Sequence, residues 1–398
     1  MHSVYIVDIL RTPVAKFAGA LSTIRPDDLA AITIKKLLER NPSIDLNEIE
    51  DIVLGAANQA GEDNRNVARM AVLLAGLPHS IGGVTVNRLC ASGLQSIMDA
   101  SRGVMCGDGK IYIAGGVESM TRAPFVMAKN DHAFGRVAEV HDTTIGWRFT
   151  NKKLVQAGHT NTMGETAENV AAKWNISRTE QDEFAIASQE KYFSAEANNR
   201  FCEERISIEI PSKKETLLFD TDEQPRNSSI EALSKLKPAF VADGSVTAGN
   251  SSGINDGAAC MILCDEATVK KYGLKPIAKI KSMAIAGVEP KYMGIGPVYA
   301  TKKALHRAGL NINDIDLIEL NEAFASQSIA CIRDLGLDIN KVNVNGGSIA
   351  IGHPLGASGS RISATLLHEM KKRGSRYGLA TMCIGVGQGA AIIFEGIA

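Results

Sequence analysis

One stretch joins a strand pattern to a helix pattern: Val84-Thr-Val-Asn-Arg-Leu-Cys-Ala-Ser-Gly-Leu-Gln-Ser-Ile97. The run 84–87 is rich in β-branched residues, and the apolar residues that follow return at helical spacing. The junction puts Cys90 at the start of a helix, where free N–H groups and the helix dipole favour the nucleophilic thiolate. A buried structural cysteine fits the same pattern, because free cysteines are common in cores. The stretch therefore predicts a strand–helix unit with one candidate nucleophile.

The same helix-to-strand order occurs twice in the chain. Two runs match, Ile34-Lys-Lys-Leu-Leu-Glu-Arg40 and Thr301-Lys-Lys-Ala-Leu-His-Arg307, and a polar turn follows each. Apolar strands are then expected at Ile49-Glu-Asp-Ile-Val-Leu54 and Ile315-Asp-Leu-Ile-Glu-Leu320. Short matches arise by chance, but the shared order and spacing indicate an internal duplication.

A third parallel extends this repeat. Like the run 84–87, Val342-Asn-Val-Asn345 leads into a turn, and that turn carries His353. Strand and helix patterns alternate along the chain, which favours sheets covered by helices. We therefore predict an α/β fold of two similar halves, residues 1–270 and 271–398.

The character of the sequence changes between about 119 and 250. This part is rich in charge, with a helix-like run from Thr166 to Arg200 and a polar stretch from Asp220 to Ser234 without strand periodicity. We interpret it as a loop domain inserted into the first half. Insertions of this size often act as lids or binding elements, and a purely structural excursion is the alternative.

Composition narrows the classes of partner. The 398 residues are 45% hydrophobic, which is enough for a substantial core. Lys and Arg total 43 against 44 Asp and Glu, so no charge excess argues for nucleic acid or a membrane surface. The chain opens on a strand-like run without a secretory leader, and no apolar run has bilayer length. A cytoplasmic location is expected.

The cysteines do not form the pattern of a disulfide framework. There are seven, an odd number scattered along the chain, which suits a reducing compartment. Cys260 and Cys264 are the only close pair. Both lie in a strand-like run, 258–264, without neighbouring histidines, so we expect core packing there and predict no metal site.

A second strand end carries Asn321. The strand-like run 317–320 stops there, and the residues from Glu322 onward have a helix pattern that ends near Gly336, which makes Asn321 an N-cap. Capping alone explains such an asparagine. A side-chain amide at this kind of turn also holds a water molecule or an oxyanion, so both interpretations stand.

A third strand end is rich in glycine: Asn345-Gly-Gly-Ser-Ile-Ala-Ile-Gly-His-Pro-Leu-Gly-Ala-Ser-Gly359. Glycine permits close backbone approach, which favours a bound ligand here. His353 lies between Gly352 and Pro354 and is either a base for a thiol, a donor to a carbonyl oxygen, or a structural histidine. An amphipathic helix is expected to follow and to end near Gly374.

The chain ends with a glycine-rich hairpin pattern, Leu379 to Phe394. A hairpin explains the glycines but gives no reason for Cys383. If Cys383 faces Cys90, one thiol attacks a carbonyl while the other moves protons, and bare backbone at Gly385 adds an N–H to an oxyanion hole. Two thiols, an imidazole and an amide indicate acyl transfer to or from sulfur.

Together these stretches resemble the active-site signatures of the thiolase family, in the family's order. They are Asn87-Arg-Leu-Cys-Ala-Ser-Gly93, Asn321-Glu-Ala-Phe324, Gly352-His-Pro354 and Cys383-Ile-Gly385. Further matches extend the resemblance nearly from end to end, namely Arg11-Thr-Pro13, Ala248-Gly-Asn-Ser-Ser-Gly-Ile-Asn-Asp-Gly-Ala258 and Met293-Gly-Ile-Gly-Pro297. The resemblance implies two βαβαβαββ halves with five-stranded sheets in a five-layered α-β-α-β-α structure, plus the inserted loop domain.

The resemblance also implies a role for each signature. Cys90 becomes acylated, and Cys383 is the acid and base. His353 activates Cys90 and helps to bind the thioester oxygen, while Asn321 holds a water molecule in that same oxyanion site. The N–H groups of Cys90 and Gly385 form a second oxyanion hole. The implied reaction is cleavage of a 3-oxoacyl-CoA by CoA, which runs backwards as a Claisen condensation.

In this family CoA is a substrate, and no tightly bound cofactor is implied. The resemblance assigns seven residues to the CoA thioester: Ser252, Ala248, Met163 and Met293 near the pantetheine, Phe240 and Arg226 toward the nucleotide, and Phe324. One position departs from the pattern. Biosynthetic acetoacetyl-CoA thiolases typically have a histidine just before the Met-Gly pair, where this chain has Thr162. That argues against a dedicated acetoacetyl-CoA role.

Some segments resemble a narrower group, the thiolases that cleave 3-oxoadipyl-CoA to succinyl-CoA and acetyl-CoA. They are Asp142-Thr-Thr-Ile-Gly-Trp-Arg-Phe149, Arg122-Ala-Pro-Phe-Val-Met127 and Cys383-Ile-Gly-Val-Gly-Gln388. A dicarboxylic acyl chain needs a cationic partner for its distal carboxylate. Arg148 and Lys152 are the candidates.

Three other functions are alternatives to this one. A general 3-oxoacyl-CoA or acetoacetyl-CoA thiolase is the nearest. A decarboxylating ketoacyl synthase shares the fold but is not expected to carry Cys383. An inactive scaffold that binds CoA or partners is at odds with intact signatures. Thiolases are dimers or dimers of dimers, so the resemblance implies a homo-oligomer.

Overall fold

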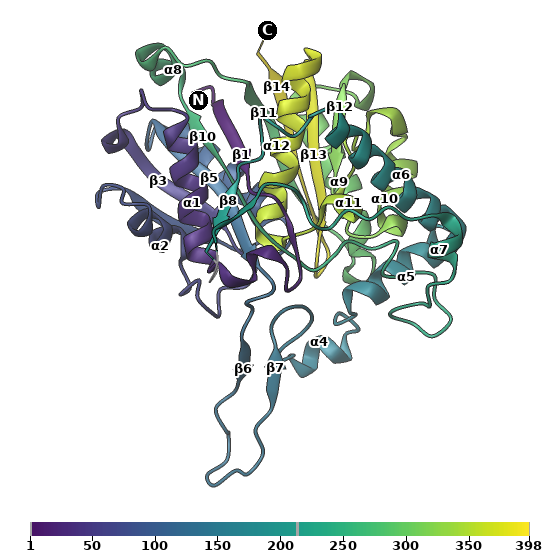
Figure 1. Ribbon diagram of the computed structural model, residues 1–398. Coiled ribbons are helices and arrows are strands. Elements are labelled where there is room, and N and C mark those ends of the chain that lie inside the picture. The colour runs from purple at the N-terminus through teal and green to yellow at the C-terminus, as the bar shows by residue number, and fades with distance from the viewer. Residues whose placement is uncertain (1, 212–214, 398) are drawn as a thin grey trace.

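A computed structural model describes residues 2–211 and 215–397, so the outermost residues of the two predicted halves, 1 and 398, lie outside it. Its main element is a ten-stranded sheet of order β12-β13-β14-β11-β1-β10-β5-β3-β4, in which β2 pairs with β10 (Figure 1). The strands are β1 Tyr5–Arg11, β2 Ala15–Lys16, β3 Ile49–Gly55, β4 Gly82–Val86, β5 Ile111–Ser119, β10 Asn255–Cys264, β11 Ala278–Gly287, β12 Leu317–Leu320, β13 Tyr377–Ile384 and β14 Gln388–Gly396. Strand β3 is parallel to β4 and β5, and β12 is parallel to β13.

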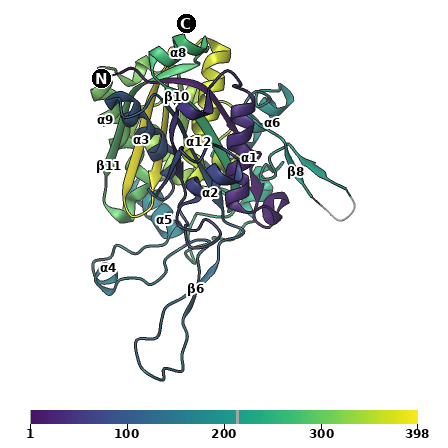
Figure 2. The ribbon, with the colours of Figure 1, turned by 90° about the vertical axis from the view of Figure 1, so that its left-hand side faces the viewer.

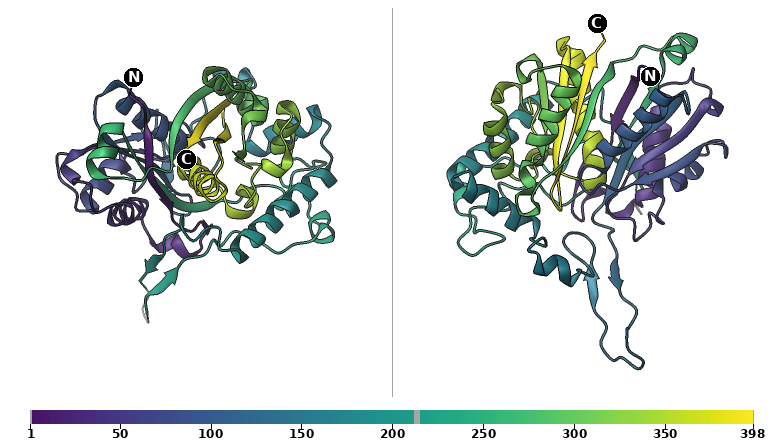
Figure 3. Two further views of the ribbon diagram at one scale, coloured as in Figure 1. Left: turned by 90° about the horizontal axis from the view of Figure 1, so that it is seen from above. Right: turned by 180° about the vertical axis from the view of Figure 1, so that it is seen from behind.

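Helices cover the outer faces of the sheet, and two more helices pack between its two halves. They are α1 Pro26–Glu39, α2 Val67–Leu74, α3 Ser92–Cys106, α8 Glu266–Tyr272, α9 Gly296–Ala308, α10 Ala325–Leu335, α11 Ser348–Ile351 and α12 Leu355–Arg373. The helices α1 and α2 cover the first-half strands, and α9 with α10 cover the second-half strands. The pair α3 and α12 packs between the two halves, so the layers follow the predicted α-β-α-β-α order (Figure 3).

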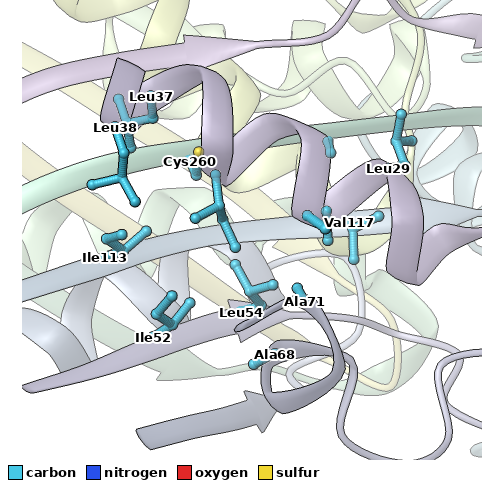
Figure 4. Close-up of a cluster of buried hydrophobic side chains, with 14 of the residues drawn as sticks. Leu29, Leu37, Leu38, Ile52, Leu54, Ala68, Ala71, Ile113, Val117 and Cys260 are labelled. Carbon is cyan, nitrogen blue, oxygen red and sulfur yellow. The ribbon is translucent and has the colours of Figure 1, made fainter. Parts of the chain in front are cut away.

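Each layer boundary is filled by its own apolar cluster. Under α1, Leu29, Leu37 and Leu38 share one cluster with Val117 of β5 and Cys260 of β10 (Figure 4). This is the helical spacing of one face packed on the alternating face of a strand, which buries apolar area from both elements. The predicted core packing of the close cysteine pair is confirmed, because both side chains are buried within β10.

The two halves share one continuous sheet. Strands β1 and β11 pair antiparallel through only two residue pairs, Tyr5 with Lys279 and Ile6 with Ala278. Much of the contact between the halves comes instead from α12, which packs on α3 and on strands from both halves. The ends of strands from both halves therefore meet around this central pair of helices.

The predicted internal repeat has matching elements. Helix α1 leads through a 3-10 turn, Leu46–Glu48, into β3, and α9 leads through Ile312–Asp314 into β12. The second half differs from the family plan, since the described residues form four named strands there, not five. Val342 makes only an isolated bridge to Ile318.

The Asn343 side chain supplies hydrogen bonds at the place where a fifth strand was expected. Asn343 has a left-handed backbone, with φ 45°, which turns the chain away from the sheet. Its side chain accepts from the N–H of Leu320 at 2.9 Å and donates to the carbonyl of Leu320 at 2.8 Å. The amide thus satisfies the backbone at the end of β12, directly before Asn321.

The central helix α12 corrects two expectations. Every residue from Gly356 to Met370 is buried, so the helix is not amphipathic, although it ends at Gly374 as expected. A Cβ on Gly359 would lie 2.2 Å from the backbone nitrogen of Leu94 in α3, and one on Gly93 would lie 2.8 Å from the nitrogen of Ser360. These glycines admit a neighbouring helix, not a ligand, because the two backbones touch.

The inserted region leaves the sheet after β5 and returns at β10. Its elements are β6 Phe125–Met127, β7 Val140–Asp142, α4 Lys152–Gln156, α5 Met163–Lys173, α6 Arg178–Ala197, β8 Ile208–Ile210, β9 Leu217–Phe219 and α7 Ile230–Ser234. Two hairpins, β6–β7 and β8–β9, project from the body (Figures 1 and 2). Within the described ranges, no helix is both long and apolar enough to cross a bilayer.

The single helix-like run expected at 166–200 is two helices. Asn175 has a left-handed backbone, with φ 52°, which stops α5. Ser177 then caps α6 and forms a capping box with Glu180, because each side chain accepts from the backbone of the other residue. The break tilts α6 onto α10 and α11 of the second half.

Candidate active site

Cys90 lies in the tight turn between β4 and α3. The residue before it, Leu89, has a left-handed backbone with φ 48°. The Ser92 hydroxyl accepts from the N–H of Arg88 at 2.9 Å and donates to the carbonyl of Leu89 at 2.6 Å, which closes the turn. Helix α3 begins at Ser92, so Cys90 precedes it by two residues. A strained backbone held this firmly is typical of functional sites.

A cavity of about 290 Å³ opens beside this turn. Its wall combines the Cys90 turn, the end of β5, the loop after β7, the start of α5 and the β13–β14 turn. The lining residues are Ala57, Asn58, Leu89, Cys90, Glu118, Met120, Ala123, Thr143, Thr144, Ile145, Gly146, Trp147, Arg148, Thr162, Met163, Leu355, Gly385 and Val386. The size suits the reacting end of a small thioester.

A second thiol lies buried near the Cys90 turn. The predicted hairpin of β13 and β14 is confirmed, and Cys383 lies buried near the end of β13, opposite Gly389. Burial raises the pKa of Cys383, and the neighbouring Cys90 thiol raises it further. Gly385, two residues after Cys383, donates its N–H to the Cys90 sulfur, so the β13–β14 hairpin brings Cys383 close to Cys90.

Burial also raises the pKa of the Cys90 thiol. The N–H groups of Gly385 and of Cys90 itself hydrogen-bond to its sulfur and lower the pKa again in part, while Glu118 raises it. The expectation that the helix start leaves Cys90 as a thiolate is therefore wrong for the free protein. Desolvation outweighs the N–H donors, so the resting group is a thiol that needs a base.

His353 is buried and neutral. Burial lowers its pKa to about 3, and the Arg361 charge contributes in the same direction. Its Nδ1 lies 2.6 Å from the Ser358 hydroxyl, and that hydroxyl donates to the carbonyl of Pro354. The hydroxyl therefore accepts from Nδ1–H, and this network leaves Nε2 without a proton. His353 has the tautomer that a general base needs.

The Asn321 side chain is oriented by a chain of donors. Its Oδ1 accepts from the Ser348 hydroxyl at 2.6 Å, and Ser348 in turn accepts from Arg361 at 2.5 Å. Its Nδ2 is thereby directed at Nε2 of His353, 3.5 Å away. The amide and the imidazole thus form one polar pair.

The expected N-cap role of Asn321 is wrong. Helix α10 begins at Ala325 and its N-cap is Phe324. Residues 321–324 stay outside the helix because they bond to the loop at 250–252: the N–H of Ser252 donates to Ala323, and the N–H of Ala325 donates to Asn250. A tertiary contact has overridden the local helix signal, and it frees the Asn321 amide for the site.

Sequence reasoning missed Glu118. This buried carboxylate lines the cavity at the end of β5 and accepts from the N–H groups of Ala57, Asn58 and Gly356 at 2.7–3.0 Å. Burial raises its pKa to about 7 in spite of these bonds. An acidic residue near the end of an otherwise apolar strand, 111–119, was the available signal.

The residues assigned to CoA fall into two groups. Met163, Met293 and Phe324 share one apolar cluster with Cys383, and the Phe240 ring packs edge-on against Phe324 at 6.1 Å. This first group adjoins the thiols. The structure thus places two of the four residues expected near the pantetheine, Met163 and Met293, beside Cys383.

The second group lies farther along the inserted region. Arg226 donates to the carbonyl of Ala248 at 3.3 Å and lines a separate cavity of about 190 Å³ beside Gly249. Ser252 donates through its hydroxyl to the carbonyl of Ala323 at 3.1 Å, on the loop that precedes α10. The loop 248–252 therefore links the two groups.

Two protein-family models match the chain, "Thiolase, N-terminal domain" over residues 4–267 and "Thiolase, C-terminal domain" over residues 274–396. The chain belongs to the thiolase family. It is 53% identical to the beta-ketoadipyl-CoA thiolase of Pseudomonas aeruginosa, with 99% of each chain covered. It is also 53% identical to the 3-oxoadipyl-CoA/3-oxo-5,6-dehydrosuberyl-CoA thiolase of Escherichia coli, with 99% of this chain and 100% of that protein covered.

The fold of this thiolase is shared with solved relatives. The crystal structure of the Bacillus anthracis acetyl-CoA acetyltransferase matches it with a TM-score of 0.93 at 39% identity, covering 100% of this chain and 99% of that one. The predicted thiolase-like fold is confirmed by this likeness. As a thiolase, the protein is an acyltransferase of the acetyl-CoA C-acyltransferase class.

Proposed function

We propose that this thiolase cleaves 3-oxoadipyl-CoA with CoA, giving succinyl-CoA and acetyl-CoA. The observation that carries the reaction type is the pair of neighbouring thiols: Cys90 lines the cavity and accepts from the N–H of Gly385, and Cys383 lies two residues before that glycine. The relatives that act on beta-ketoadipyl-CoA and 3-oxoadipyl-CoA, each 53% identical over nearly the whole chain, support the substrate.

The first half-reaction breaks the carbon–carbon bond. The Cys90 proton passes to Nε2 of His353, and the thiolate attacks the 3-keto carbon. Collapse of the tetrahedral adduct breaks the bond between C2 and C3. It leaves a succinyl thioester on Cys90 and the enolate of acetyl-CoA, which takes a proton on C2 from the Cys383 thiol.

The second half-reaction transfers the acyl group. Acetyl-CoA leaves, and free CoA gives its thiol proton to the Cys383 thiolate. The CoA thiolate then attacks the succinyl thioester, and the Cys90 thiolate leaves and recovers its proton from His353. Each group ends in its starting protonation state, which fits the resting thiols and the neutral imidazole.

Two donor sets stabilise the oxygens that gain charge. The N–H groups of Gly385 and Cys90 bond to the sulfur in the free protein and, in this proposal, to the oxyanion of the tetrahedral adduct. Nε2 of His353, once protonated, and a water molecule held by Asn321 serve the enolate oxygen. Donors fixed before the reaction are effective because the charge appears only in the transition state.

CoA enters as a substrate in this scheme, and we propose no tightly bound cofactor and no metal. The pantetheine runs past Ser252, Ala248, Met163, Met293 and Phe324. The nucleotide lies toward Phe240 and Arg226. Support comes from the apolar cluster that Met163, Met293 and Phe324 form with Cys383.

The same proposal covers the organisation of the protein. The halves are residues 1–270 and 271–398, with the insertion at about 119–250, and the bounds of the two family models, 4–267 and 274–396, support this division. We propose a cytoplasmic homo-oligomer, a dimer or a dimer of dimers. The exposed apolar side chains Phe125 and Phe134 in and beyond β6 support a contact between subunits.

A substrate panel in the thiolytic direction tests the proposal. We expect kcat/KM to be higher for 3-oxoadipyl-CoA than for 3-oxohexanoyl-CoA or acetoacetyl-CoA by about 100-fold or more, because a site built for a carboxylate discriminates strongly. Equal rates, or faster cleavage of acetoacetyl-CoA, would favour the second candidate, a general 3-oxoacyl-CoA or acetoacetyl-CoA thiolase. The likeness to an acetyl-CoA acetyltransferase supports that candidate, and Thr162 at the start of α5 argues against it.

A further inference from the structure

The cavity beside Cys90 has few charged residues in its wall. Among the lining residues that the structure describes, Arg148 is the only cation and Glu118 is the only acid. Most of the other lining groups are apolar or are hydroxyls and amides. A single guanidinium in a mainly apolar wall is suited to select one charged ligand group.

Glu118 does not neutralise Arg148. Its two oxygens are engaged by the N–H groups of Ala57, Asn58 and Gly356. Arg148 itself forms no hydrogen bond and no ion pair with any residue of the described ranges, although it is partly buried. A half-buried guanidinium with five unused donors is ready to accept a ligand.

The loop that carries Arg148 is anchored to the body. Thr143 donates through its hydroxyl to the carbonyl of Pro124 at 2.6 Å and accepts from the Asn58 side chain at 2.9 Å. At the other end, Trp147 donates through its ring N–H to the carbonyl of Asn161 at 3.3 Å. The residues 143–148 therefore form a fixed wall of the cavity, and Arg148 follows directly after the second anchor.

The other cationic candidate lies elsewhere. Lys152 is exposed at the start of α4 and does not line the cavity. Its ammonium remains in water, where an ion pair with a carboxylate is weak. The structure thus separates two residues that the sequence left equivalent.

We propose that Arg148 binds the distal carboxylate of the acyl chain and makes this thiolase selective for 3-oxoacyl-CoA substrates that end in a carboxylate. The inference rests on the proposed function and adds the residue that determines the substrate specificity. The fork of the guanidinium pairs with both carboxylate oxygens, and the ligand displaces water from the apolar wall, which strengthens the pair. The acyl group on Cys90 is held in the same way during both half-reactions.

Replacing the charge while keeping a polar side chain tests this assignment. The measurement is kcat/KM of wild type, Arg148→Gln and Arg148→Lys for 3-oxoadipyl-CoA and for 3-oxohexanoyl-CoA, which has a methyl group in place of the carboxylate. We expect Arg148→Gln to lose about 10- to 100-fold with 3-oxoadipyl-CoA and to change less than about threefold with 3-oxohexanoyl-CoA. Arg148→Lys should recover part of the loss, since it keeps the charge without the fork.

Lys152→Gln is the matched control, because it removes a nearby positive charge from outside the cavity. It should leave both substrates unchanged. If wild type prefers 3-oxoadipyl-CoA and Arg148→Gln keeps that preference, the assignment to Arg148 is overturned while the proposed function stands. If Arg148→Gln loses activity with both substrates alike, Arg148 does not select the carboxylate. If wild type shows no preference, the proposed function fails first.

Discussion

Cys90 and Cys383 carry the same functional group in opposite settings. Cys90 lies in a strained turn, next to Leu89 with φ 48°, and is partly exposed at a cavity. Cys383 lies within β13, paired across the hairpin with Gly389, and is buried. A turn lets one sulfur face a bulky acyl group, whereas a strand holds the other at a fixed depth. In the proposed mechanism, this contrast suits Cys90 to attack and Cys383 to proton transfer.

Removing each thiol gives the largest effect and tests this division. Cys90→Ala should lower turnover by about 10⁴-fold or more, because no other group accepts the acyl chain. Cys383→Ala should lower it by about 10²- to 10⁴-fold, the usual effect of a lost general acid and base. Steady-state thiolysis measures both losses, and intact-protein mass spectrometry after incubation with succinyl-CoA reports the acyl-enzyme.

The mass measurement separates the two roles. Cys383→Ala should still carry a succinyl group on Cys90, and Cys90→Ala should carry none. Cys106→Ala, at the exposed end of α3, is the control and should behave as wild type. A succinyl group found on Cys383 in the wild type would reverse the assignment.

The second prediction concerns what positions each thiol. A methyl group at Gly359 would press on the backbone of Leu94 in α3, the helix that follows the Cys90 turn. Cys383 is positioned differently, by the hydrogen-bonded pairing of β13 with β14. We expect Gly359→Ala to lower stability by about 1 to 3 kcal/mol through overpacking and to lower kcat/KM as well. Thermal unfolding and thiolysis measure the two effects.

Gly287→Ala is the matched control for that change. Nothing lies within 4 Å of a Cβ at this position at the end of β11, so its melting temperature and activity should equal those of wild type. Equal melting temperatures for Gly359→Ala and wild type would contradict this prediction, because they would show that α3 and α12 can move apart slightly at little cost in stability.

The smallest expected effect is in the reactivity of the free thiols. A raised pKa keeps the Cys90 thiol protonated at neutral pH. Its alkylation rate should therefore still increase above pH 9.0, which is the ordinary pKa of a cysteine thiol. Cys383 should react about tenfold more slowly at each pH, because its pKa is also raised and it is buried. Iodoacetamide labelling with peptide mass spectrometry measures each rate, with exposed Cys106 as reference. A plateau for Cys90 below about pH 7.5 would show an activated thiolate and contradict the resting state described here.

Local patterns in the sequence predicted much of this fold and site. The strand ends before Cys90 and Asn321, and the hairpin that carries Cys383, follow from apolar runs that stop at turn residues. The repeat of α1 and β3 in α9 and β12 is visible because both copies kept the same order of elements.

The features that sequence missed depend on contacts between distant segments. Asn321 does not cap α10, because the loop 250–252 holds the intervening residues out of the helix. Glu118 gains its environment from backbone N–H groups at 57, 58 and 356, and none of these is near it in the chain. Gly359 marks a helix crossing and not a ligand site, and only the position of α3 reveals that.

The crossing of α3 and α12 has a consequence for synthesis on the ribosome. A chain emerges with its N-terminus first, so Cys90 and α3 appear early, while α12 and the β13–β14 hairpin are made last. Until then, the inner face of α3 lacks its partner and Cys90 lacks His353, Cys383 and the N–H of Gly385. A truncated or stalled chain therefore presents a thiol without a site around it. Completion of the last strand is the event that turns the nascent polypeptide into an enzyme.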